Sequence, residues 1–166
     1  VGASGPRIVI STACAASTNA IGLGADLLDD GEADVAIVGG ADAIQFATYA
    51  GFSGLQALSP AACAPYAVSA GLNLGEGGAF LVLERAGDAA RRGATALAAV
   101  LGYGLAADAH HPTAPDPTGR GALRSVSAAL AQAGLSIADI DYVNGHGTGT
   151  PANDGMERRV MVSLFG

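Results

Sequence analysis

The chain has 166 residues, a net charge of −7 and apolar residues at 50% of its positions. This length is enough for one globular domain with a sizeable core. The acidic balance argues against a nucleic-acid partner, which would need a basic stripe to neutralise phosphates. No apolar stretch reaches the roughly 18 residues that span a bilayer, because Gly, Asp or Glu interrupts each one. We therefore expect neither a nucleic-acid partner nor a membrane span.

The sequence contains two cysteines, Cys14 and Cys63. They lie in unlike settings without metal-ligand spacing, so we expect neither a disulfide framework nor a bound metal. The sequence begins close to a predicted strand and shows no leader in which basic, apolar and small-residue regions follow in order. These features favour a reducing, cytoplasmic location.

The first elements have the pattern of a strand, a helix and a second strand. Residues 7–11 are predicted to form a buried strand, and residues 15–30 a helix that ends at Gly31. Residues 35–38 form a continuous apolar run, as is typical of a parallel strand covered on both faces. We therefore predict a βαβ unit.

Cys14 lies where the first strand bends into the helix. The unpaired N–H groups and positive end of a helix favour a thiolate at this position. Free cysteines are more often small, inert and buried, but the polar side chains of Ser11, Thr12 and Ser17 surround this one in the sequence. We therefore interpret Cys14 as a nucleophile.

The middle of the chain is less regular. Residues 41–73 are predicted to form a helix followed by a loop, and residues 74–84 a glycine-rich loop that leads into a strand. A second apolar run, 96–105, could pair with that strand as a hairpin. The charged link 85–93 is interpreted as a solvated turn with a short helix, whose arginines lie on the surface.

The last third of the chain is predicted to hold two helices and a short strand. The first helix covers about 121–133 and ends at Gly134, and the strand at 141–144 delivers His146. Asp154 could cap the final helix. Without further context, a single histidine in a glycine-rich loop could equally be a turn residue or a metal ligand.

Several motifs occur in a fixed order along nearly the whole chain. They lie at residues 12–17, 58–60, 65–66, 71–77, 108–117 and 144–150. In this order and spacing they resemble the β-ketoacyl synthases of the thiolase superfamily, and the loop at 108–117 is similar to that of the bacterial elongating enzymes. The resemblance implies an α/β fold with a thiolase-like layered αβαβα architecture. Residues 1–45 would be the end of its first half, and 46–166 most of its second half.

The resemblance also implies roles for individual residues. Cys14 would accept the acyl group as a thioester, and its backbone N–H would be one oxyanion-hole donor. His146 would donate a hydrogen bond to the malonyl thioester carbonyl and so stabilise the enolate formed as carbon dioxide leaves. Thr148 and Thr150 match hydroxyls that bind the amides of phosphopantetheine, although such residues also occur in plain turns.

The implied activity is decarboxylative Claisen condensation with a malonyl-acyl carrier protein, in fatty-acid or polyketide synthesis. The partner would be the acyl carrier protein, whose phosphopantetheine carries the substrates, with no bound cofactor. The family also implies a homodimer in which residues 6–10 pair across a twofold axis. Asn144 resembles a position associated with a structural cation in some members, and we predict no metal there.

Other polar groups are expected to be structural. Asp154 and Glu157 fit the motif but are interpreted as first-turn carboxylates of a helix. Glu76 is expected to accept backbone N–H groups. Cys63 is interpreted as a loop cysteine without a partner. The adjacent histidines 110–111 are expected to be solvated or locally hydrogen-bonded.

The sequence departs from the family pattern at several points. Ser69 and Ala70 stand where an acidic and a basic residue are usual, and Gly145 replaces a more usual alanine. The chain ends before the family's lysine, its second histidine and its other oxyanion donor, and the N-terminal sheet half is missing. We therefore expect an internal fragment in which Leu23, Leu27 and Leu28 could face solvent.

Three alternatives to a decarboxylating synthase stay open at this point. The chain could be a catalytically incomplete fragment that acts only as a structural or dimerisation module. It could be a thiolase relative that works without decarboxylation. It could also be a cysteine hydrolase in which Cys14 and His146 are nucleophile and base.

Overall fold

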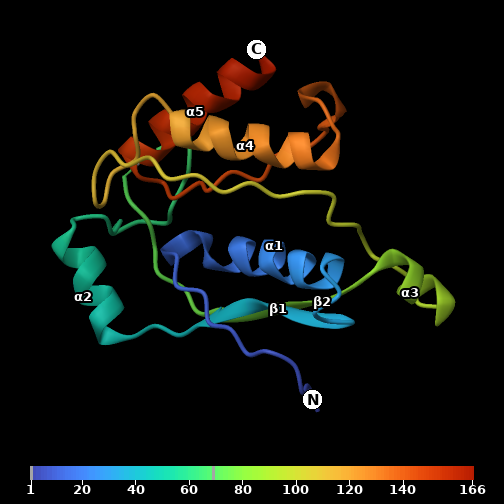
Figure 1. The fold of residues 1–166 in the computed structure, drawn as a ribbon. Helices are drawn as coiled ribbons and strands as arrows, with labels where there is room; N and C mark the ends of the chain where they lie inside the picture. Colours follow the sequence, from blue (N-terminus) through green and yellow to red (C-terminus); the bar gives the residue numbers. More distant parts are fainter. Residues whose placement is uncertain (1, 69) are drawn as a thin grey trace. The chain divides into compact units, whose positions relative to one another are not determined.

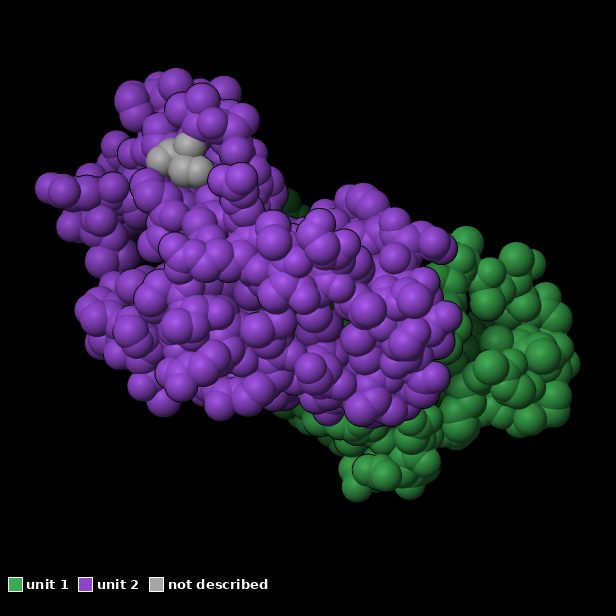
Figure 2. Space-filling view, turned by 90° about the horizontal axis from the view of Figure 1, so that it is seen from above, with its two compact units in different colours: residues 1–42, 77–101 green, residues 43–76, 102–166 purple. Residues whose placement is uncertain are grey.

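In the computed structural model, which describes residues 2–68 and 70–166, the chain forms two compact units. The first unit consists of residues 1–42 and 77–101, and the second of residues 43–76 and 102–166 (Figure 2). Each unit is therefore built from two separate stretches of the sequence. Cys14 belongs to the first unit and His146 to the second.

The first unit is built on a two-stranded antiparallel sheet. Strands β1 (Val35–Asp42) and β2 (Gly77–Glu84) pair in a register that joins Val35 to Glu84 and Asp42 to Gly77. Helix α1 (Ala16–Asp29) follows the short 3₁₀ turn η1 (Ala13–Ala15) and lies along one face of the sheet (Figure 1). The predicted helix at 15–30 is confirmed.

Small residues let α1 approach the sheet closely. A β-carbon on Gly24 would lie 2.4 Å from Cγ1 of Val38, so this helix position has no room for a side chain. Leu28 and Val38 are among the most buried apolar residues, with 5% and 7% of their surfaces exposed. The expectation that these helix leucines could face solvent is wrong for Leu28, which is buried, while Leu23 and Leu27 are half-buried.

The opposite face of the sheet is apolar and exposed. The cross-strand pair of Ile37 and Val82 lies on this face together with Val35 and Phe80. These four side chains are between 50% and 64% exposed. The first unit therefore has one covered and one open sheet face among the described residues.

The structure confirms the predicted strands at 35–38 and within 74–84, which are β1 and β2, and corrects the other predicted strands. The described residues 7–11 form no strand, and β1 pairs antiparallel with β2, so the predicted parallel βαβ unit is wrong. Residues 96–105 do not pair with β2 as a hairpin, and the described residues 141–144 are not a strand. An apolar run specifies neither burial nor the hydrogen-bonded neighbour that a strand needs, and Val9 and Leu97 in these runs are 94% and 99% exposed.

Arg85 holds the end of α1 against the sheet. Its Nη1 donates to the carbonyls of Leu28 at 2.8 Å and Ala33 at 2.7 Å, and its Nη2 pairs with Asp34 at 2.7 Å. The Asp34 carboxylate raises the pKa of Arg85. The short helix α3 (Ala86–Arg91) that follows confirms the predicted helix in this link. Arg85, however, is a half-buried tie to one carbonyl in the last turn of α1 and one beyond it, and not a free surface arginine.

The regular elements described in the second unit are helices and a 3₁₀ turn, joined by long loops. This unit contains α2 (Phe46–Gly54), α4 (Arg120–Ala133), the 3₁₀ turn η2 (Ile137–Asp139) and α5 (Pro151–Phe165). The predicted helices at 121–133 and at the end of the chain are confirmed, as is the helix within 41–73. Among the described residues, no helix is long and apolar enough to cross a membrane.

The segment before α4 packs directly against this helix. A β-carbon on Gly104 would lie 2.0 Å from the carbonyl oxygen of Ser125, so the extended segment touches the α4 backbone. Gly134 ends α4 in the left-handed conformation at φ +66°, which glycine adopts without strain. The predicted end of this helix is therefore confirmed.

The loop before α4 is held by its own polar groups. Asp116 is 3% exposed and accepts hydrogen bonds from the hydroxyl and N–H of Thr118, and these bonds, with the pairing to Arg120, lower the pKa of Asp116. Nδ1 of His111 accepts the N–H groups of Thr113 at 3.1 Å and Ala114 at 3.2 Å. The expectation of local hydrogen bonding by His111 is confirmed.

Candidate active site

Cys14 lies in the turn η1, immediately before α1, and its side chain is exposed. The residue before it, Ala13, has φ +51°, a left-handed conformation that non-glycine residues rarely adopt. Such backbone strain persists only where neighbouring contacts hold it, and it is concentrated at functional sites. The thiol is thus presented by a strained, sharp turn at the start of a helix.

Local contacts close this turn. Nδ2 of Asn19 donates to Oγ1 of Thr12 at 2.7 Å, and the N–H of Ala15 donates to the carbonyl of Thr12 at 3.2 Å. Gly40 of β1 leaves room for Ser17, because a β-carbon at Gly40 would lie 2.7 Å from the Ser17 hydroxyl. Residues on both sides of Cys14 and on the adjacent strand therefore shape its surroundings.

His146 lies in the loop 144–150 of the second unit, directly before α5. The backbone N–H of His146 donates to Oε1 of Glu157 at 2.6 Å, and the N–H of Gly147 donates to Oε2 at 2.8 Å. Glu157 is 9% exposed. A single buried carboxylate from α5 thus fixes two consecutive peptide groups at the histidine, while the His146 side chain stays exposed.

The environment of Glu157 keeps it ionised. Burial raises the pKa of this carboxyl, but the N–H groups of Gly147 and His146, with the Tyr66 hydroxyl and the Asn153 amide, outweigh burial and hold the pKa below its usual value. A carboxylate that accepts several hydrogen bonds is a strong acceptor at neutral pH. Glu157, which its position in the sequence suggested to be a first-turn carboxylate, instead organises the histidine loop.

Asp154 acts on the same loop from one turn earlier in α5. Its Oδ1 accepts the N–H of Gly149 at 3.1 Å, and its Oδ2 accepts the N–H of Tyr66 at 2.9 Å. The N-cap of α5 is Thr150, so the prediction that Asp154 caps this helix is wrong. Asp154 instead joins the histidine loop to the segment that contains Tyr66.

Thr148 and Thr150 lie side by side. Their Oγ1 atoms are 2.8 Å apart, and both residues are half-buried. A hydroxyl that is engaged in one such bond keeps further donor or acceptor capacity. The two threonines predicted to act together are therefore adjacent and retain groups that can bind amides.

Cys63 has a partner, contrary to the expectation from the sequence. Its Sγ lies 3.4 Å from the carbonyl of Thr148, to which the thiol donates, and its N–H donates to Oδ1 of Asn73 at 2.7 Å. A β-carbon on Gly149 would lie 2.5 Å from this sulfur. Cys63 thus packs beneath the threonine loop, and its side chain fills space that only a glycine at 149 leaves open.

Glu76 and Asn73 hold the glycine-rich segment. Oε2 of Glu76 accepts the N–H of Ile44 at 3.2 Å, which confirms the expectation of a structural carboxylate. Nδ2 of Asn73 donates to the carbonyls of Ser59 at 3.1 Å and Ala61 at 3.0 Å. The sequence analysis assigned no role to Asn73. Ser69, where the sequence departs from the family pattern, lies outside the described residues.

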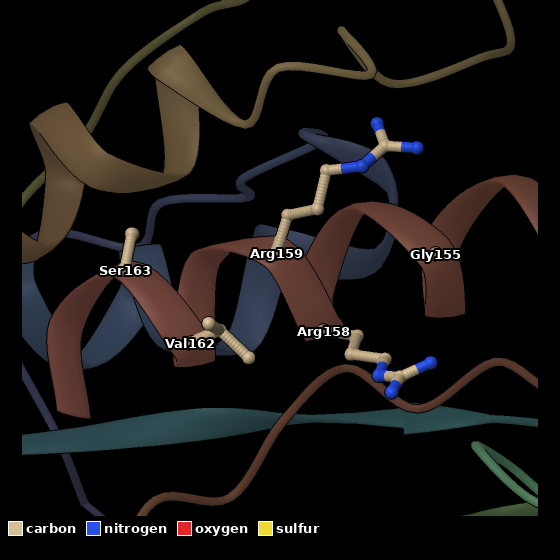
Figure 3. Close-up of a pocket in the computed structure, with 5 residues that line it drawn as sticks. All are labelled: Gly155, Arg158, Arg159, Val162 and Ser163. Atoms are coloured by element: carbon tan, nitrogen blue, oxygen red, sulfur yellow. The ribbon is translucent and has the colours of Figure 1, made fainter. Parts of the chain in front are cut away.

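Two hollows lie in the second unit. One, of about 600 Å³, has a mixed lining that includes the apolar Ile44 and Leu72 and the polar Asn73. The other, of about 510 Å³, lies along α5 and has Arg158 and Arg159 in its lining, and their side chains point in opposite directions (Figure 3). Within residues 2–68 and 70–166, no group of three or more His, Cys, Asp or Glu side chains could hold a metal ion.

Comparisons with known proteins match both parts of the chain to one family. Residues 1–89 match the β-ketoacyl synthase N-terminal domain, and residues 97–166 match the β-ketoacyl synthase C-terminal domain. The chain is 41% identical over 173 residues to 3-oxoacyl-[acyl-carrier-protein] synthase 2 of Staphylococcus aureus, covering 100% of the chain and 43% of that protein. It is also 41% identical over 168 residues to nodulation protein E of Rhizobium meliloti, covering 100% of the chain and 41% of that protein. The chain thus spans less than half the length of these relatives.

Solved structures give the same result. A type II polyketide synthase ketosynthase, AntDE, in complex with its acyl-carrier protein AntF matches with a TM-score of 0.95 and 30% identity, over 99% of this chain and 43% of that one. The ketosynthase ApeO, in complex with its chain length factor ApeC from Xenorhabdus doucetiae, matches with a TM-score of 0.89 and 42% identity, over 98% and 39%. The predicted α/β, thiolase-like fold is therefore confirmed for the part present. The chain belongs to the β-ketoacyl synthase family.

Proposed function

We propose that this chain carries the nucleophile and the first histidine of a β-ketoacyl synthase, an acyltransferase that condenses a cysteine-bound acyl group with a malonyl thioester. The observation that carries the proposal is the match of both family domains to a chain that retains Cys14 and His146 in their motifs. Two features of the site agree with it. Cys14 is exposed at a helix start, and the peptide groups at His146 are held by a buried carboxylate.

In the first half-reaction, the Cys14 thiolate attacks the carbonyl carbon of an acyl thioester. A carbon–sulfur bond to Cys14 forms, the bond to the carrier thiol breaks, and the carrier leaves as a thiolate. In this proposal the backbone N–H of Cys14 donates to the negative oxygen of the tetrahedral intermediate. A thioester product keeps the acyl group activated for the second step.

In the second half-reaction, His146 donates a hydrogen bond to the carbonyl oxygen of the malonyl thioester. The carbon–carbon bond to the malonyl carboxylate breaks and carbon dioxide leaves. The electron pair of this bond stays on the thioester and forms an enolate. The enolate carbon attacks the acyl carbon on Cys14, and the Cys14 thiolate is the leaving group. The product is a β-ketoacyl thioester that is two carbons longer than the starting acyl group, and these two carbons come from the malonyl unit.

The substrate carrier is an acyl carrier protein in this proposal. Thr148 and Thr150 bind the amides of its phosphopantetheine arm, which requires no separate cofactor. A carrier protein and a chain length factor occur with related ketosynthases in solved structures. We further propose a cytoplasmic enzyme of fatty-acid or polyketide synthesis that forms a homodimer through residues 6–10.

The test is the intact mass of the protein after incubation with a short acyl thioester, followed by a malonyl thioester. The first reagent should add one acyl group, and the second should remove it with release of carbon dioxide and a β-ketoacyl product. A C14A variant controls for acylation elsewhere, because Cys63 remains in it. Acylation that persists in this variant would overturn the assignment of the nucleophile.

A second candidate function is a catalytically incomplete module that serves structure or dimerisation only. The open apolar face of the β1–β2 sheet, with Ile37, Phe80 and Val82 exposed, favours it. Large exposed apolar patches mark interaction sites in soluble proteins. Light scattering on the intact protein, together with the acylation test, distinguishes the two, since only the module gives a stable assembly without acyl transfer.

A further inference from the structure

Tyr66 reaches the two carboxylates that hold the histidine loop. Its hydroxyl donates to Oε2 of Glu157 at 2.8 Å, and its backbone N–H donates to Oδ2 of Asp154 at 2.9 Å. Its φ is +63°, a conformation that costs a bulky residue energy and needs surrounding contacts to persist. The segment that contains Tyr66 is therefore tied at two points to α5, although 88 and 91 residues separate it from its partners in sequence.

Glu157 links Tyr66 to the peptide groups of the histidine. Oε2 accepts the Tyr66 hydroxyl, the Gly147 N–H at 2.8 Å and Nδ2 of Asn153 at 2.8 Å, while Oε1 accepts the His146 N–H at 2.6 Å. The three donors on Oε2 fix the plane of the carboxylate. That plane determines where Oε1 lies, and so where the His146 peptide is held.

Gly145 is the residue that admits the tyrosine hydroxyl. A β-carbon on Gly145 would lie 2.2 Å from Oη of Tyr66, which is far closer than atoms tolerate. The ring carbon Cζ would be at 3.4 Å and Oε1 of Glu157 at 3.2 Å, so the hydroxyl is the principal obstacle. The conformation of Gly145 itself is not one that excludes alanine, because its φ lies outside the left-handed region.

We propose that Tyr66 and Gly145 form a matched pair that positions the His146 loop for the decarboxylating half-reaction. Tyr66 is a positioning residue, since it acts on His146 through Glu157. The glycine is needed because the hydroxyl occupies the space that its side chain would fill. The inference rests on the proposed function for the role of His146, but the steric pairing stands independently of it.

The protonation state of Tyr66 suits this role. Burial, then the hydrogen bond and charge of Glu157, raise the pKa of Tyr66 to about 12. The phenol therefore remains a donor throughout the neutral range, and Glu157 remains an acceptor. The contact does not switch within the pH range in which a thioester enzyme works.

The pairing predicts different effects on the two half-reactions. Tyr66, Gly145 and His146 belong to the second unit, whereas Cys14 is held by contacts within the first. Loss of the hydroxyl should therefore slow decarboxylation of the malonyl thioester and leave acylation of Cys14 unchanged. A residue that served only global stability would lower both half-reactions together.

The experiment is a double-mutant cycle in the intact protein with Y66F, G145A and the double variant. Decarboxylation of a malonyl thioester, acylation of Cys14 and the thermal unfolding midpoint are measured for each. We expect Y66F to slow decarboxylation about threefold to tenfold and G145A to slow it about tenfold or more. The double variant should decarboxylate as fast as Y66F and faster than G145A, because the clash is gone.

Two matched controls separate these effects from general damage. Y49F removes the hydroxyl of a tyrosine of α2 that is 53% exposed, and G155A adds a methyl group where nothing lies within 4 Å. Neither should change the half-reactions. Either control behaving like its test variant would overturn the specific pairing.

The outcomes distinguish this inference from the proposed function. A G145A variant that is equally impaired with Tyr and with Phe at position 66 overturns the pair, as does a Y66F variant that slows both half-reactions equally. If the wild-type protein fails to decarboxylate malonyl thioester, the proposed function fails. The unfolding midpoints then still test the pair, because G145A should lower them only when Tyr66 is present. Should G145A not fold at all, a folded double variant supports the pair and an unfolded one overturns it.

Discussion

Cys14 and His146 are held in different ways. The Cys14 turn is exposed and closed by contacts between near neighbours, chiefly Asn19 and Thr12. The His146 loop is fixed by a buried carboxylate, Glu157, that also binds a residue 91 positions away. Contacts close to a helix start therefore hold the Cys14 turn, whereas the His146 loop depends on a network assembled from distant parts of the chain.

The largest expected effect on stability comes from changing Glu157, which holds the His146 loop. An E157Q variant keeps the size of the side chain but loses the charge and places an amide where the oxygens accept N–H and O–H groups. Since bonds to a buried charged group contribute strongly, we expect a loss of about 2 to 3 kcal/mol in the free energy of unfolding. Urea denaturation measures it.

The matched control is E32Q, which alters an exposed glutamate of the first unit. This control should change the unfolding free energy by less than about 0.5 kcal/mol. If E157Q also changed the unfolding free energy by less than about 0.5 kcal/mol, the carboxylate would not organise the histidine loop. The contrast between the Cys14 turn and the His146 loop would then disappear.

The pH dependence of the unfolding free energy gives a second test of the role of Glu157. The pKa of Glu157 lies below its usual value, so its ionised form stabilises the fold at pH values above the ordinary glutamate pKa of about 4.3. The stabilisation is lost as the pH falls through the lowered folded-state pKa. The difference in unfolding free energy between wild type and E157Q should therefore be constant near neutrality and shrink in acid. A difference that grows on acidification contradicts the assignment.

An intermediate effect is expected where α1 packs on the sheet in the first unit. G24A adds a methyl group 2.4 Å from Cγ1 of Val38, and overpacking of this kind costs about 1 to 3 kcal/mol. The control G155A, in open space, should be neutral or gain up to about 1 kcal/mol, because alanine favours the helix. Equal unfolding free energies for the two variants would show that α1 does not approach the sheet as described.

The smallest expected effect on stability comes from changing Asn19, which closes the Cys14 turn. N19A removes the 2.7 Å hydrogen bond to Thr12 and should cost about 0.5 to 1 kcal/mol, since the bond is exposed. Its influence should be clearer in the rate of Cys14 acylation, with malonyl decarboxylation unchanged. An N19A variant that slows decarboxylation as much as acylation would break the distinction between the two sites.

The sequence predicted the helices well and the strands poorly, for a physical reason. The predicted helix at 15–30 is observed as Ala16–Asp29, and that at 121–133 as Arg120–Ala133, because helical spacing and capping are local properties. The apolar runs at 7–11 and 96–105 indicated strands, yet neither has a strand partner among the described residues. Strand pairing depends on segments far away in sequence, as the pairing of β1 with β2 illustrates.

The candidate site divides in the same way. Cys14, His146 and the adjacent threonines follow from ordered motifs, and a motif is a local feature. The role of Tyr66 could not be predicted, since its hydrogen bonds to α5 exist only in the folded chain. Glycine in place of alanine at 145 looked like a small change, but the Tyr66 hydroxyl would lie 2.2 Å from an alanine β-carbon there.

The most direct test of the central claim is the intact mass of the protein after incubation with a short acyl thioester, beside the C14A variant. We predict one retained acyl group in the wild-type protein and none in C14A. An equal gain of mass in both proteins, or no gain in a folded wild-type sample, would contradict the claim that Cys14 is the acyl-accepting nucleophile of a β-ketoacyl synthase.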